Sequence, residues 1–275
     1  SASEASDYTI KVDATGLRPD RRYFYRFNAR GINSATGTTR TLPDGVATNF
    51  TIGVASCSNF PQGFFNAYRD MAETDLDLVL HLGDYIYEYP EAEYANDYAR
   101  EVLKRSVVPQ HEVIALEDYR MRYGLYRTDP DLQALHQRHP FICVWDDHEL
   151  ANDTWREGAE NHNEGEGDFR QRIAAARQAY HEWMPVRTPN EGDQGPIYRR
   201  FEIGTLADLI MLDTRLVGRD RGLAYAQDMR FAPALAGEAP IADVAAFKDQ
   251  RLNDPTRSLL GQIQEEWLDE ALRKS

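Results

Sequence analysis

The chain alternates short, continuously apolar runs with segments of helical periodicity. Four apolar runs stand out: Ile52–Ala55, Leu76–Leu82, Phe141–Trp145 and Leu206–Leu212. Helical spacing is found at Gly63–Ala72, at Asp168–Met184 and in the tail at Ser258–Arg273. Short buried strands that alternate with helices are typical of an α/β fold built on a largely parallel sheet. We therefore predict an α/β core from about residue 51 onward.

The first forty residues have a different pattern. Tyr8–Val12 and Arg22–Phe27 read as short strands separated by a turn at Leu17–Asp20, and glycines and Pro43 follow them. This pattern is typical of a β-sandwich. An immunoglobulin-like sandwich needs about seven strands, whereas this segment supplies about three. We expect part of such a domain, cut at its N-terminus.

Composition and charge narrow the class of protein. With 275 residues and 42% hydrophobic content, the chain can bury a large core. Its apolar runs of about six residues are far shorter than the roughly 20 that span a bilayer. A net charge of −14 argues against a nucleic-acid-binding surface or an anionic-membrane surface. The two cysteines, Cys57 and Cys143, leave three options open: one disulfide, two free thiols or a metal ligand.

Candidate metal-binding residues follow three of the predicted strands. Cys57 follows the first, Asp84 and Tyr87 follow the second, and the run from Asp146 to Glu149 follows the third. Ligands gather at the carboxyl ends of strands in open α/β sheets, so these groups should converge if the strands are neighbours. An aspartate can bridge two cations, and thiolate or phenolate ligands favour a Lewis-acidic metal. His148 could protonate a leaving alkoxide or stabilise an anionic transition state.

Each of these residues also has a purely structural interpretation. Cys57 alone is more often a small buried hydrophobe, and Asp84 could cap a turn or helix. The tyrosines at 85, 87 and 89 could simply pack, and His81 reads as a core histidine. The acids beside His148 are harder to dismiss, because burying them is costly without a cation or a hydrogen-bond network. Asn152 could be a loop cap or an additional oxygen ligand.

Several ordered motifs resemble those of the PhoD-type alkaline phosphatases and phosphodiesterases. They are Ala55–Asn59, His81–Tyr89 and Trp145–Asp153, with secondary matches at Ala179–Pro185 and Leu212–Arg215. The resemblance implies a calcineurin-like metallophosphoesterase fold, with two β-sheets packed together and helices outside. It also implies two parts: residues 1–46 as the C-terminal part of an immunoglobulin-like β domain, and residues 47–275 as the N-terminal part of the catalytic domain.

The same resemblance implies a pair of metal ions. Ferric iron (Fe³⁺) would be held partly by Cys57, Asp84 and Tyr87, with Asp84 bridging toward Ca²⁺ or another divalent cation. For the second metal the ligand could be Asp147 or Asn152, and both are carried forward. His148 would be the catalytic histidine. The family also suggests a secreted or periplasmic location.

The predicted reaction is hydrolysis of phosphate monoesters by a metal-activated hydroxide. A phosphodiesterase or phospholipase on the same scaffold is one alternative, and a noncatalytic binding module stabilised by calcium is another. No Gly-Asp-x-His segment, which completes the site in this family, follows Asp213. We therefore expect a chain truncated at both ends, whose partner is the missing C-terminal half of the catalytic domain and which has negligible activity alone.

Overall fold

The core of the molecule is a parallel sheet of three strands with the order β5-β6-β7. The computed structural model describes residues 2–187, 196–228, 231–232, 241–242 and 244–275. The strands are β5 (Ile52–Ala55), β6 (Leu78–His81) and β7 (Phe141–Cys143). Every residue of the central strand β6 is buried, which explains why three apolar residues follow one another in it. Three of the predicted strands are thus confirmed.

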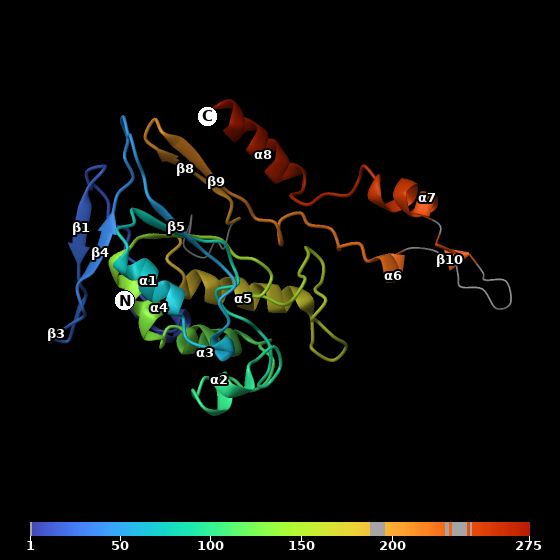
Figure 1. Cartoon of the computed structure of the whole chain (residues 1–275), viewed down its shortest axis with the longest axis horizontal. Coiled ribbons are helices and arrows are strands. Elements are labelled where there is room, and N and C mark those ends of the chain that lie inside the picture. Colours follow the sequence, from blue (N-terminus) through green and yellow to red (C-terminus); the bar gives the residue numbers. More distant parts are fainter. Residues whose placement is uncertain (1, 188–195, 229–230, 233–240, 243) are drawn as a thin grey trace.

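Helices pack in pairs around this sheet (Figure 1). One pair is α1 (Asn66–Glu73) with α4 (Pro130–Arg138), and the other is α3 (Leu116–Tyr126) with α5 (Phe169–Trp183). A short helix, α2 (Asp97–Glu101), follows β6. Aspartates cap two of these helices: Asp168 accepts from the amide of Arg170 in α5, and Asp129 accepts from the first turn of α4. The predicted helices at 63–72 and 168–184 are confirmed as α1 and α5.

A separate antiparallel hairpin is formed by β8 (Arg199–Ile203) and β9 (Ala207–Met211), next to α8 (Gln262–Arg273). The ring of Tyr198 lies 4.7 Å from that of Trp267 in α8. The predicted strand at 206–212 therefore exists as β9, but it pairs with β8 and not with the parallel sheet. The predicted tail helix is confirmed as α8.

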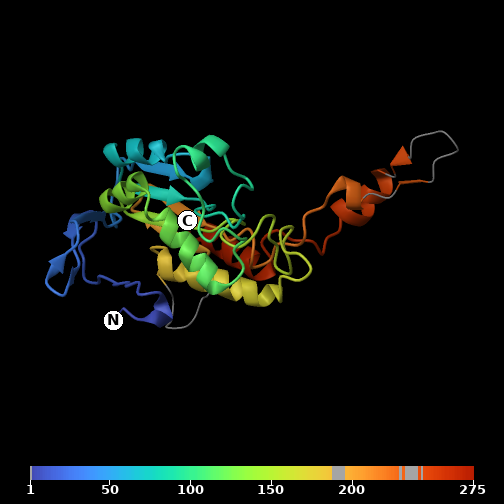
Figure 2. The same cartoon turned by 90° about the horizontal axis from the view of Figure 1, so that it is seen from below.

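Between β9 and α8 the chain forms an arm that projects from the body in both views (Figures 1 and 2). Its described elements are α6 (Tyr225–Asp228), β10 (Phe231–Ala232), β11 (Ile241–Ala242), α7 (Val244–Phe247) and a π-helical turn at Lys248–Leu252. Within the described part of the chain, none of the helices has the length and apolar character that crossing a membrane demands.

The N-terminal region forms two small antiparallel ladders and a short 3-10 turn at Glu4–Ser6. A second 3-10 turn, at Phe60–Gln62, follows β5. In these ladders β1 (Arg22–Tyr25) pairs with β4 (Gly37–Arg40), and β2 (Asn28–Ala29) pairs with β3 (Ile32–Asn33). The predicted strand at Tyr8–Val12 is wrong: the segment has no strand partner among the residues that the structure describes, and its apolar side chains are exposed. An alternating pattern becomes a strand only where a second strand satisfies its backbone groups. The immunoglobulin-like sandwich stays a prediction.

Candidate functional site

The loops after β5, β6 and β7 meet at the carboxyl edge of the parallel sheet. The amide of Cys57 donates to the carbonyl of Gly83 at 3.2 Å, which joins the first two loops. Gly83 has a φ of +103°, and a Cβ built there would lie 2.2 Å from the backbone nitrogen of Asp146. Only glycine permits this close approach of the second and third loops. The convergence predicted from the strand ends is therefore present.

Asp84, Asp147 and His148 form a buried cluster at this edge. Each offers a ligand atom, and these atoms lie within 4.8 Å of one another. Burial raises the pKa of Asp84; His148 opposes the shift, whereas the carboxylates of Asp147 and Asp146 reinforce it. Two buried carboxylates this close are costly unless a cation compensates them. The donor set therefore fits a bound metal ion.

Tyr87 and Cys57 lie beside Asp84. The hydroxyl of Tyr87 donates to Oδ2 of Asp84 at 3.4 Å. Burial and then the Asp84 carboxylate raise the pKa of the Tyr87 phenol, so the phenol stays protonated until a cation replaces that proton. Cys57 is a free, exposed thiol that hydrogen-bonds to Asp84, and partial desolvation raises its pKa. The structure thus brings all three predicted iron ligands to one place.

The two candidates for the second-metal ligand differ in their surroundings. Asp147 belongs to the buried cluster, whereas the side chain of Asn152 donates to Glu160 at 2.9 Å near the surface. Arg215 reaches in from the loop after β9. Its guanidinium contacts Asp146 at 2.5 Å and Asp147 at 3.3 Å. Arg215 belongs to the motif Leu212–Arg215, and the sequence alone indicated no role for it.

His148 has a buried carboxylate partner that sequence reasoning missed. Its Nδ1 lies 2.8 Å from Oε2 of Glu88, whose other oxygen accepts from the backbone of Asn152 and the side chain of Asn161. Burial lowers the pKa of His148, but the hydrogen bond that His148 donates to Glu88, together with nearby carboxylates, outweighs this effect and raises the pKa to about 9. The available signal was an acid in a run of tyrosines directly after a buried strand.

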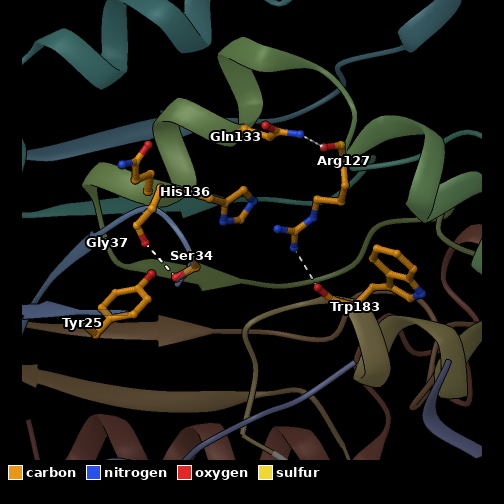
Figure 3. A pocket seen from close by; sticks show the side chains of 9 residues that line it. Tyr25, Ser34, Gly37, Arg127, Gln133, His136 and Trp183 are labelled. Atoms are coloured by element: carbon orange, nitrogen blue, oxygen red, sulfur yellow. Dashed lines mark hydrogen bonds between the residues drawn. The ribbon is translucent and has the colours of Figure 1, made fainter. Parts of the chain in front are cut away.

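A pocket of about 430 Å³ lies elsewhere, between the N-terminal strands and the helices (Figure 3). In it the guanidinium of Arg127 donates to the carbonyl of Trp183 at 2.7 Å. No carboxylate lines the pocket, so it does not fit metal chemistry. Its lining residues are Tyr25, Ser34, Ala35, Gly37, Arg127, Gln133, His136, Gln137 and Trp183.

Comparisons with known proteins point to one family. The sequence profile described as PhoD-like phosphatase matches residues 52–275, and that of the PhoD-like phosphatase N-terminal domain matches residues 1–43. Alkaline phosphatase D of Bacillus subtilis (strain 168) is 39% identical over 269 residues, which cover 95% of this chain and 42% of that protein. A solved structure described as the structure of PhoD matches with a TM-score of 0.79 and 37% identity, over 97% of this chain and 48% of that one. The chain thus spans less than half the length of both relatives.

Proposed function

This chain belongs to the PhoD-like phosphatase family, and we propose that its natural protein hydrolyses phosphate monoesters at the cluster of Asp84, Asp147 and His148. The observation that carries the proposal is the meeting of these three buried side chains where the parallel strands end. Neighbouring strands present their carboxyl ends to one ligand, and a phosphate ester is the ligand that a cation-filled acidic site would attract.

The residues of this site suit two different cations. Cys57, Asp84 and Tyr87 would hold ferric iron, because a thiolate and a phenolate are anionic ligands that favour a strongly Lewis-acidic metal. Asp84 and Asp147 would hold Ca²⁺ or another divalent cation, with Asn152 as a further oxygen donor. When bound, such cations supply Lewis acidity, which lowers the pKa of water and offsets the charge of the phosphate group.

His148 would act on the leaving group. The Glu88 carboxylate engages its Nδ1, which leaves Nε2 to face a substrate, and Nε2 has no hydrogen-bond partner among the described residues. Glu88 favours the protonated form of the imidazole, because its carboxylate hydrogen-bonds to the ring and raises its pKa. A protonated ring can give that proton to an alkoxide as the P–O bond breaks, or stabilise its charge. Arg215 holds the Asp146 side of the loop in place.

A phosphodiesterase or phospholipase reaction is the second candidate, because the same side chains serve either ester. We also propose a secreted or periplasmic location, and only the membership of the family supports it. The test is turnover of a phosphate monoester and a matched diester by the metal-loaded full-length protein. Faster turnover of the monoester is expected, and a reversed preference would move the assignment to the second candidate.

The matched variants for this test are Asp84→Asn and Asp118→Asn. Asp118 is also a buried acid, but its carboxylate accepts from the amide of Ala115 at the start of α3. We expect Asp84→Asn to lose bound metal and nearly all turnover, and Asp118→Asn to keep both. Undiminished hydrolysis in Asp84→Asn, or after complete removal of metal by a chelator, would overturn the proposal.

A further inference from the structure

Three tyrosine rings surround the imidazole of His148. The ring centroids of Tyr87, Tyr89 and Tyr94 lie 4.3, 5.4 and 6.4 Å from that of His148, and Tyr94 is nearly parallel to it, at 18°. Tyr94 also contacts the other two tyrosines, at 5.6 and 5.5 Å. Tyr87 is 4% exposed, but Tyr94 is 56% exposed. One aromatic face of this group is therefore open to solvent beside the histidine.

The backbone at Tyr94 is held in place from the site side. Its carbonyl accepts from the side-chain amides of Asn59 and Gln62, at 2.8 and 2.9 Å, and both of these residues follow the proposed ligand Cys57. The φ of Tyr94 is +47°, in the left-handed region that is strained for a residue with a side chain. Such strain persists only where the surroundings impose the conformation. The backbone that carries the exposed ring is thus fixed beside the site.

We propose that Tyr94 is one wall of a binding site for the organic leaving group of the ester, and that this site favours an uncharged group with an aromatic or apolar face. The inference rests on the proposed function, in which His148 serves the leaving oxygen. Whatever is bonded to that oxygen must lie next to His148, and the exposed ring of Tyr94 lies 6.4 Å from the imidazole. Stacking on that face removes apolar surface from water.

The charge around Tyr94 supports an uncharged leaving group. Glu93 precedes it on the same loop, and Glu91 lies two residues before that, partly neutralised by Arg100 at 3.5 Å. Negative side chains at the edge of the site repel an anionic leaving group. An aryl or short alkyl alcohol meets no such repulsion.

Binding of two non-hydrolysable phosphonates to the metal-loaded full-length protein tests this inference. Phenylphosphonate carries an aromatic group and methylphosphonate does not, and calorimetry gives both dissociation constants. We expect Tyr94→Ala to weaken phenylphosphonate by about 3- to 10-fold, the range of one aromatic stacking contact, and to leave methylphosphonate unchanged. Tyr94→Phe should bind both as the parent protein does, because it keeps the ring.

Tyr98→Ala is the matched control, since Tyr98 is also an exposed tyrosine, on α2, with no ring contact to the His148 group among the described residues. It should leave both constants unchanged. Equal weakening of the two phosphonates by Tyr94→Ala, or no weakening of either, would overturn the inference. Failure of the proposed function looks different: the parent protein would hydrolyse no phosphate ester, whatever the Tyr94 variants bind.

Discussion

The backbone amide of Asp84 donates a 3.0 Å hydrogen bond to the buried carboxylate of Glu149, which lies 65 residues further along the chain. The same carboxylate accepts from the amides of Tyr85 at 2.5 Å and Asp146 at 2.8 Å. Glu149 therefore ties the loop after β6 to the loop after β7. This side chain therefore helps to set the distance between the proposed metal ligands Asp84 and Asp147.

Glu149→Gln should destabilise the protein, although the glutamine side chain has the same shape as that of glutamate. All three partners of Glu149 are N–H donors, and glutamine presents an amide nitrogen where one of its two acceptor oxygens was. A buried donor that loses its acceptor costs about 1–3 kcal/mol, measurable as a lower free energy of unfolding in denaturant. Glu157→Gln, at an exposed acid, is the control and should change nothing. Equal stability of the two variants would contradict the clamping role.

Glu88→Gln should slow turnover by acting through His148. When His148 carries a proton on Nδ1, every partner of the Glu88 carboxylate is a hydrogen-bond donor. A glutamine amide nitrogen at this position would face one of these donors, which disfavours the orientation and the tautomer of the His148 ring. We expect a loss of about 10- to 100-fold, compared with about 10²–10⁴-fold for His148→Ala. Esters with poor leaving groups should suffer most in both variants, as measured by kcat/KM over a series of leaving-group acidities.

The double variant separates positioning from a general effect on the fold. If Glu88 acts only through the imidazole, adding Glu88→Gln to His148→Ala should cost little further activity. Independent, additive losses would mean that Glu88 supports the site in another way. A loss that is the same across all leaving groups would instead assign His148 to stabilisation of charge in the transition state.

The sequence predicted those strands and helices whose own residues show a clear apolar run or a helical spacing. Strand β6 is buried on both faces, so Leu78, Val79 and Leu80 follow one another, and the ligands just after the strand were found from that run. Strand β8 was missed, because its residues Arg199, Arg200 and Glu202 are charged and its pattern is not apolar. Without β8 there was no reason to place β9 in a hairpin. Helix α4 was missed although Asp129 and Pro130 form a standard helix start.

The partners of the site residues were out of reach for a different reason. Glu88 and His148 are separated by 60 residues, and Arg215 lies 69 residues after Asp146. The packing of the loops decides which charged side chains meet across such separations. The local pattern of apolar and polar residues contains no information about that packing. The types of residue at the strand ends could therefore be predicted, whereas the hydrogen bonds that orient them could not.

Asp129→Ala should be among the most destabilising substitutions away from the site. Asp129 caps α4 and also forms a fully buried ion pair with Arg105 at 2.9 Å. Removing one partner leaves a buried charge uncompensated, at a cost of about 3–5 kcal/mol in the free energy of unfolding. Arg273→Ala is the comparison, because Arg273 pairs with Asp269 in α8 with both side chains exposed, and it should change the free energy of unfolding little. Similar costs for the two variants would contradict the argument from burial.

Tyr87→Phe tests the proposed iron site directly, because a phenolate bound to ferric iron gives a visible charge-transfer absorption. The variant lacks only the hydroxyl that lies 3.4 Å from Asp84, and it keeps the ring that contacts His148 at 4.3 Å. We expect the iron-loaded full-length protein to lose this absorption while its fold and its thermal stability are preserved. Cys57→Ser tests the thiolate separately: its exposed position predicts a larger loss of iron, by elemental analysis, than of stability. An unchanged spectrum in an iron-loaded Tyr87→Phe protein would exclude the tyrosine as a ligand, and full iron content in Cys57→Ser would exclude the cysteine.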